Sequence, residues 1–251
     1  MIVPTRNAAS GIDACLSSLW AQSCRDYEVL VLDGQSTDGT LQKLQSHAAR
    51  FGQALRWHSE PDAGVYHAMN RGIAHARGEW LHFLGADDVL HDPEVLADVV
   101  RFMATRQADI VYGDVVERAS GARYGGEFSL DRLLFECNIC HQAVYYRRSV
   151  FEKLGGYNTR YPIWADWDFN IRCFRHPGMR AIWTDRVIAV YRARSGISRV
   201  EDPVFRRELP ATLLRDARLQ RGGALRRWLR TRLSRWLGDS PRSRRRPIAK
   251  R

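Results

Sequence analysis

Apolar runs alternate with segments of helical period along the first ninety residues. The runs YEVLVLD, which ends at Asp33, and EWLHFL, which stops just before Asp87 and Asp88, are typical of strands buried on both faces. Shorter strands are predicted at IVPT and near residues 55–58. Helices are predicted at 12–19, after GQSTDGT and at 65–76. Strands and helices that alternate at short intervals predict an α/β fold with a parallel sheet and helices on both faces.

The pattern is less regular after residue 112. Strands are predicted at DIVYGDVV and QAVYYRR, a short helix at SVFEKLGGY that stops at Gly155 or Gly156, a helix within WADWDFNIRCFR, and a final pair of strands in AIWTDRVIAVYR. We therefore expect a Rossmann-like, mostly parallel sheet over 1–112 that forms a ligand-binding half. A mixed half over 113–200 and a basic tail over 201–251, disordered from Asp239, are expected to follow.

Charge is concentrated at the C-terminal end. The net charge is +11, but residues 206–251 hold sixteen Lys and Arg against three acidic residues, and the rest holds 23 basic and 25 acidic residues. A nearly neutral body argues against a nucleic-acid-binding protein. No apolar stretch reaches the roughly 18 residues of a membrane span, and the N-terminus does not read as a secretory signal. With five scattered cysteines, these features predict a cytoplasmic protein.

The tail contains an amphipathic pattern over residues 219–237. Its apolar stripe is interrupted by Arg232 and consists of Leu225, Trp228, Leu229, Leu233, Trp236 and Leu237. A basic helix with Trp on its apolar side predicts peripheral binding to the anionic inner face of the cell membrane. The alternative is a helix that packs on its own domain and exposes its Arg side chains.

Carboxylates follow two of the predicted strands. Asp87 and Asp88 are adjacent, and two neighbouring charges repel when their hydration is lost. They form either an Asp-rich turn before a helix or a pair of ligands for a divalent cation. Asp33 also follows a strand, and ligands of parallel sheets bind beyond the carboxyl ends of the strands. The three carboxylates are therefore expected to share a site.

Five segments in order carry a resemblance to a known family. They are VPTRN (3–7), VLDGQSTDGT (31–40), SEPDAGVYHAMNRGIAHARGEW (59–80), FLGADD (83–88) and ADWDF (165–169). Together they resemble inverting, nucleotide-sugar-dependent family-2 glycosyltransferases with the GT-A fold, of the kind that build bacterial exopolysaccharide, capsule or lipopolysaccharide. The resemblance implies a nucleotide-sugar donor and a glycan or polyprenyl-diphosphate-linked acceptor.

The resemblance also implies roles for residues of the first half. Asp88 would be the main contact of Mg²⁺ or Mn²⁺, and Asp87 would serve the metal or the ribose. The family often has Asp where this chain has Gly85, which leaves the division between Asp87 and Asp88 open. Such a cation neutralises charge that develops on the leaving diphosphate.

The remaining donor contacts are implied in the same way. Pro4, Thr5 and Asp33 would line the nucleotide pocket, with Asp62 and Asn70 near the nucleotide. Two alternatives stay open: Asp33 is also a turn-former before Gly34, and Asn70 is also an ordinary surface residue of its helix.

An inverting transfer needs a base for the acceptor hydroxyl, and the family carries it in an acidic motif at a helix start. Here that motif is WADWDF, with Ala165 where Glu is frequent, and Asp166 is the predicted base. Asp168 is the competing candidate, and either Asp also fits a helix N-cap. Trp164 and Trp167 suit stacking on an acceptor sugar or packing in a core.

The sequence contains one other recognisable motif and is compatible with one other class of protein. CNICH (137–141) has the spacing of a c-type haem attachment site, which needs an exported chain, whereas His141 and Gln142 fit a His-Gln pair of the family. Neither haem nor zinc is expected there. A catalytically inactive nucleotide-sugar-binding scaffold of the same fold is the alternative to an enzyme.

Overall fold

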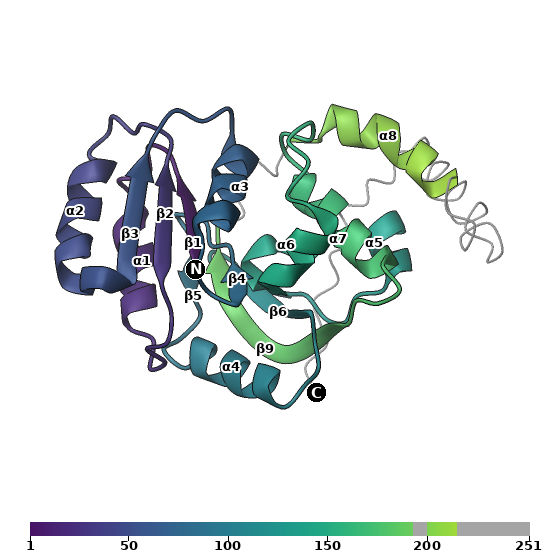
Figure 1. Ribbon diagram of the computed structural model, residues 1–251, viewed down its shortest axis with the longest axis horizontal. Coiled ribbons are helices and arrows are strands. Elements are labelled where there is room, and N and C mark those ends of the chain that lie inside the picture. The colour runs from purple at the N-terminus through teal and green to yellow at the C-terminus, as the bar shows by residue number, and fades with distance from the viewer. Residues whose placement is uncertain (193–199, 215–251) are drawn as a thin grey trace.

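The computed structural model describes residues 1–192 and 200–214 (Figure 1). The amphipathic helix predicted over 219–237 and the segment from Asp239 onward lie outside the described residues. In the described part of the chain, none of the helices combines the length and the apolar content that a membrane span requires.

Three short parallel strands form the first sheet. They are β1 (Ile2–Thr5), β2 (Val29–Asp33) and β3 (Leu55–Ser59), in the order β1-β2-β3. Side chains that alternate along β2 enter two different cores: Leu30 and Leu32 one, Val29 and Val31 the other. A strand buried on both faces has this property, because successive side chains point to opposite faces.

Helices cover both faces of this sheet, as predicted. They are α1 (Ile12–Trp20), α2 (Thr40–Phe51), which a 3₁₀ turn η1 (Gly52–Ala54) follows, and α3 (Val65–His75). Tyr66 and Met69 of α3 share the core of Leu30 and Leu32, whereas α1 and α2 contribute to the other core. Helix α3 lies close to β1 and β2, since a Cβ at Gly72 would stand 2.5 Å from Ile2 Cγ2 and 3.2 Å from Leu32 Cδ2.

The second sheet has six strands of mixed direction. They are β4 (Trp80–His82), β5 (Val89–Leu90), β6 (Ile110–Glu117), β7 (Arg123–Tyr124), β8 (Val144–Arg147) and β9 (Ala181–Tyr191). The order is β4-β8-β6-β9-β5, with β7 on β6, and β6 and β9 run parallel. A parallel bridge between Ile2 and Phe83 connects it to the first sheet. The boundary expected after residue 112 falls inside β6, so the two halves share this sheet.

The remaining helices of the described residues follow the first sheet along the chain. They are α4 (Val95–Ala104), α5 (Leu130–Phe135), α6 (Arg148–Leu154), α7 (Ala165–Arg175) and α8 (Pro203–Leu214), with a 3₁₀ turn η2 (His141–Ala143) before β8. Helices α5, α6 and α7 gather on the opposite side of the molecule from α2 (Figure 1). Gly155 ends α6 with a φ of 75°, which confirms one of the two predicted stops.

The predicted strand pair in AIWTDRVIAVYR is wrong, because the segment forms the single eleven-residue strand β9. Its register with β6 shifts between Tyr112, opposite Trp183, and Asp114, opposite Val187. The polar residues between Trp183 and Val187 therefore make a bulge, which bends a strand without reversing it. Gly113 lies opposite the bulge, where a Cβ would collide with the Arg186 carbonyl.

Candidate active site

The carboxyl edge of the first sheet brings four of the predicted donor residues together. Thr5 lies in register with Asp33, and the Gly34 amide donates to the Thr5 carbonyl at 2.8 Å. Pro4 and Thr5 are buried in β1. Asp62 lies over Gly34, with its Oδ2 2.6 Å from the place where a Cβ would stand. Gly34 thus allows the SEPDAG segment to approach the end of β2.

Asp33 forms the turn after β2. Its Oδ2 accepts from the Ser36 amide at 3.0 Å and from the Ser59 hydroxyl at 2.6 Å, and its Oδ1 accepts from the Ser36 hydroxyl. The carboxylate is fully buried. This is the turn-forming role that the sequence left as the alternative, and a direct nucleotide contact would require these serines to move. Asp62 is partly exposed, so it is the more accessible carboxylate of this edge.

We expect Asp33→Ala to lower the free energy of unfolding by about 2–4 kcal/mol, because three donors lose their buried acceptor. We also expect it to raise the donor KM with little change in kcat, because the loop that the carboxylate shapes contacts donor equally before and during transfer. Chemical denaturation and steady-state kinetics measure the two effects. Asp26→Ala is the matched control, since Asp26 is exposed and precedes β2 at the opposite edge of the sheet. A large fall in kcat at unchanged KM contradicts this role.

Asp87 and Asp88 lie in a turn after β4 that Gly85 shapes. The Asp88 amide donates to the Gly85 carbonyl at 3.0 Å. A Cβ at Gly85 would stand 2.6 Å from Asp88 Oδ2 and 3.3 Å from Asp87 Oδ1, so both carboxylates converge on the space that glycine leaves empty. An Asp at this position would displace Asp88. The departure from the family pattern is therefore linked to the way this chain places its two carboxylates.

Asp88 is almost fully buried, at 4% exposure. Its Oδ2 accepts from Gln142 Nε2 at 2.7 Å and its Oδ1 from the Arg192 amide at 3.1 Å. Burial raises the pKa of this carboxyl, while the hydrogen bond from Gln142 opposes that shift. The Asp87 turn also adjoins the start of α1, since a Cβ at Gly11 would stand 2.9 Å from the Asp87 Cα.

The carboxylate oxygens of Asp87 and Asp88 at this turn suit a hard divalent cation. Among the described residues no group of three or more His, Cys, Asp or Glu side chains forms a metal cage. Mg²⁺ sites commonly use one or two carboxylates and complete their coordination with substrate phosphates and water. Two carboxylate oxygens that converge beside Gly85 match that kind of site, and Asp88 and Asp87 would be its protein ligands.

Asp166 lies in the first turn of α7 and is held by side chains from two other elements. Its Oδ1 is 2.6 Å from the Tyr66 hydroxyl of α3, and its Oδ2 accepts from Asn138 Nδ2 at 2.9 Å. Burial, at 8% exposure, raises the pKa of Asp166, and the nearby His141 and the Tyr66 hydrogen bond oppose the shift. A carboxylate with a raised pKa is better matched to proton abstraction than an ordinary Asp.

Asp168 has a different environment. Its Oδ2 pairs with Arg172 Nε at 2.9 Å, one turn later on α7. Burial raises the pKa of Asp168, and Arg172 opposes that shift. The tryptophans of this motif are partly buried and pack against the core. Trp164 and Trp167 lie against each other and against Phe205 of α8, and Trp167 Nε1 donates to the Leu133 carbonyl at 2.6 Å.

Residues 138–142, part of the CNICHQ segment, connect the predicted metal ligand Asp88 and the predicted base Asp166. Asn138 contacts Asp166 and Gln142 contacts Asp88, four residues apart. His141 lies near both carboxyls, so that a positive charge on its ring would lower the pKa of each. The segment therefore brings Asp88 and Asp166 to opposite ends of one short stretch of chain.

Asn70 is the predicted site residue that the structure does not bring to these carboxylates. Its amide pairs with the Tyr157 backbone in both directions, at 2.9 and 2.8 Å. It lines a cleft of about 540 Å³ between α3 and α6, whose lining includes none of the predicted carboxylates. The structure thus gives Asn70 the role of fixing the segment after α6, and its contact with the nucleotide stays a prediction.

Sequence reasoning missed three residues of this site. Tyr66 stands inside a quoted motif and Asn138 inside the segment weighed for haem, but neither had a signal for its partner. Asp202 is fully buried and accepts from the backbone amides of Ile163 and Trp164, just before Asp166, and from those of the first turn of α8. The pair Asp202-Pro203 is a helix-start signal that could have indicated the cap but not the link to Asp166.

Comparison with known protein families yields one matching model. Residues 1–155 match the model described as glycosyl transferase family 2. A PGL/p-HBAD biosynthesis glycosyltransferase of Mycobacterium bovis is 46% identical over 221 residues, which are 87% of this chain and 86% of the relative. An uncharacterized glycosyltransferase of Mycobacterium tuberculosis is 35% identical over 172 residues, which are 66% of this chain and 64% of the relative.

Solved structures share the fold. TarS 1-349 of S. aureus in complex with UDP superposes with a TM-score of 0.63 at 21% identity, over 76% of this chain and 59% of TarS 1-349. The mannosyltransferase PcManGT of Pyrobaculum calidifontis, in complex with GDP-Man and Mn²⁺, superposes with a TM-score of 0.62 at 25% identity, over 96% of this chain and 76% of PcManGT. These neighbours confirm the predicted GT-A fold.

Proposed function

The chain belongs to glycosyl transferase family 2, and from this premise we propose that it transfers a hexose from a nucleotide-sugar donor to a glycan or lipid-linked acceptor with inversion. One observation carries the proposal: residues 138–142 hold a carboxylate of the donor half, Asp88, and a carboxylate of the acceptor half, Asp166. Reaction between a donor and an acceptor bound on the two sides needs two groups placed in this way.

Inversion requires a single displacement. The acceptor oxygen forms its bond to the anomeric carbon while the bond from that carbon to the diphosphate oxygen breaks, and the electron pair leaves with the nucleoside diphosphate. The proton of the acceptor hydroxyl goes to Asp166, whose raised pKa favours its uptake. Asp168 is less suited to this step, because its carboxylate is already paired with Arg172.

The donor end needs positive charge for the leaving diphosphate. Asp88 and Asp87 would hold Mg²⁺ or Mn²⁺, which supplies Lewis-acid neutralisation of that charge when bound. PcManGT is a neighbour of this fold whose complex contains GDP-Man and Mn²⁺, and TarS is one with UDP. Both support a nucleotide-sugar donor for this chain.

The relatives suggest the biological setting. The relative that is 46% identical is named for PGL/p-HBAD biosynthesis, and we propose that this chain acts in biosynthesis of a comparable kind, as a cytoplasmic protein peripheral to the membrane. The basic segment 219–237 would provide the contact with anionic lipid.

A donor panel tests this function. We expect one UDP- or GDP-sugar to raise the melting temperature in the presence of Mg²⁺ or Mn²⁺, because a ligand at 100 times its Kd adds about 2.7 kcal/mol of stability. The same donor should then release free nucleoside diphosphate with a lipid or glycan acceptor. Asp26→Asn is the control that should respond like the wild type. Binding without any turnover across an acceptor panel would instead favour the inactive scaffold.

A further inference from the structure

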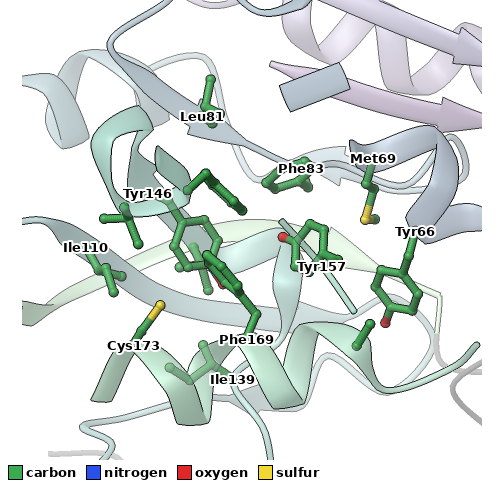
Figure 2. Close-up of a cluster of buried hydrophobic side chains, with 14 of the residues drawn as sticks. Tyr66, Met69, Leu81, Phe83, Ile110, Ile139, Tyr146, Tyr157, Phe169 and Cys173 are labelled. Atoms are coloured by element: carbon green, nitrogen blue, oxygen red, sulfur yellow. The ribbon is translucent and has the colours of Figure 1, made fainter. Parts of the chain in front are cut away.

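Tyr66 faces two acceptors with one proton. Its hydroxyl oxygen is 2.6 Å from Asp166 Oδ1 and 2.8 Å from the Ile163 carbonyl oxygen. A phenol donates only one hydrogen bond, whereas its oxygen also accepts. Tyr66 extends from α3 into the aromatic cluster to which α7 contributes Phe169 (Figure 2), and it is 6% exposed.

The hydrogen bonds that lead to Asp166 Oδ2, on the other side of the carboxylate, all run in one direction. Tyr146 donates to Asn170 Oδ1 at 2.7 Å, Asn170 Nδ2 donates to Asn138 Oδ1 at 2.8 Å, and Asn138 Nδ2 donates to Asp166 Oδ2. Tyr146 and Asn170 are almost completely buried. Since each amide in this chain uses its oxygen as the acceptor, Oδ2 always meets a donor. Tyr66 is thus the partner of Asp166 that can change.

Deepening the proposed function, on which this step rests, we propose that Tyr66 is the positioning residue that serves both protonation states of the catalytic base. Before transfer, its hydroxyl donates to the ionised carboxylate. When Asp166 has taken the acceptor proton, the hydroxyl turns its proton to the Ile163 carbonyl and its oxygen accepts from the carboxylic acid. No proton is lost or gained by Tyr66, and Asp166 keeps its hydrogen bond with Tyr66 in both protonation states.

The groups around Asp166 leave this role to Tyr66. His141 faces it from η2, Tyr146 from β8 and Tyr157 from the segment after α6. On α7 itself, Asp168 and Arg172 neutralise each other. Asp202 faces the backbone amides of Ile163 and Trp164 and accepts there.

The test removes the Tyr66 hydroxyl and reads Asp166 directly. In Tyr66→Phe we expect the pKa of Asp166, followed by carbon-13 NMR of Asp-labelled protein and assigned with Asp166→Asn, to rise by about one unit. The ionised form loses a charge-assisted hydrogen bond, which is stronger than the neutral bond that the acid form loses. The acidic limb of the kcat profile should rise by the same amount. Tyr145→Phe is the matched control, since the Tyr145 hydroxyl is buried in the other core and has no hydrogen-bond partner among the described residues.

The outcomes separate this role from the proposed function. An unchanged NMR pKa in Tyr66→Phe overturns the positioning role whatever the enzyme does. A raised NMR pKa with an unmoved acidic limb shows that the contact exists but that Asp166 is not the base, which refutes both the role and the base assignment. A parallel rise of both supports the two together.

A second variant tests the two-acceptor arrangement. The amide of Asp166→Asn imitates the protonated group, and Tyr66 would then accept from it while donating to Ile163. Adding Tyr66→Phe in this background should therefore lower the melting temperature by several degrees, because both the introduced amide and the Ile163 carbonyl lose their partner. An unchanged melting temperature overturns the arrangement.

Discussion

Asp166→Asn is expected to lower kcat by about 10²–10⁴-fold, the usual contribution of a positioned acid or base. The amide keeps the shape of the carboxylate but cannot take the acceptor proton. Donor affinity should survive, since the donor contacts expected at Asp88 and at the carboxyl edge of the first sheet remain. The measurement is kcat across pH at saturating donor.

The pH dependence follows from the pKa of Asp166. Burial raises it, so the wild-type acidic limb should lie above the range of an ordinary Asp, with activity rising as the carboxyl ionises. The limb should be absent from whatever activity Asp166→Asn retains. A residual profile that keeps the wild-type limb would show that another group titrates there.

Asp166→Asn is not expected to destabilise the protein, although it lowers the activity. The raised pKa means that the folded chain binds this proton more tightly than the unfolded chain, so stability is lost as pH rises through the folded pKa. At neutral pH the amide removes that loss, and the free energy of unfolding should be unchanged or higher. Asn138 can donate to the amide oxygen, and Tyr66 can accept from its nitrogen, so the fold should be retained.

Asp168→Asn is the matched comparison on the same helix. It breaks the pair with Arg172, and the expected loss is that of a partly exposed pair, within about 1 kcal/mol of stability, with a much smaller fall in kcat. An inactive Asp168→Asn beside an active Asp166→Asn would move the base by two residues. Two active variants would place the base outside ADWDF.

Asp88→Asn should abolish the part of donor binding that depends on divalent cation and lower kcat by about 10²–10³-fold, comparable to the loss of one preorganised charge at a transition state. The fold should persist, because Gln142 can turn its amide and the Arg192 amide keeps an oxygen acceptor. Calorimetry of donor binding with and without Mg²⁺ or Mn²⁺ measures the first effect, and steady-state kinetics the second.

Asp87→Asn, measured alongside Asp88→Asn, distinguishes the roles of the two carboxylates. Loss of cation response in both variants would make both residues ligands, whereas a raised donor KM with intact cation response in Asp87→Asn would assign Asp87 to the ribose. Asp26→Asn again controls for a lost negative charge. Near-normal, EDTA-insensitive turnover in Asp88→Asn would exclude a metal role for Asp88.

Local sequence patterns predicted the regular elements well where one element has one reason to form. The apolar run that ends at Asp33 became β2 with all five residues buried, because a strand covered on both faces has no polar position. The segment AIWTDRVIAVYR was harder, because its polar middle suits either a turn or a bulge. The pairing with β6, 71 to 74 residues earlier in the chain, decided for the bulge.

The sequence by itself determined the family resemblance, the order of strands and helices in the first half, and the carboxylates that the chemistry needs, because these depend on residue type and short spacing. The tertiary structure alone decided what each carboxylate meets. Asp33 is enclosed by Ser36 and Ser59, whereas Asp166 receives Tyr66 from one hundred residues earlier in the chain. A hydrogen bond depends on distance in space, and sequence spacing does not report distance between elements that only the packed core brings together.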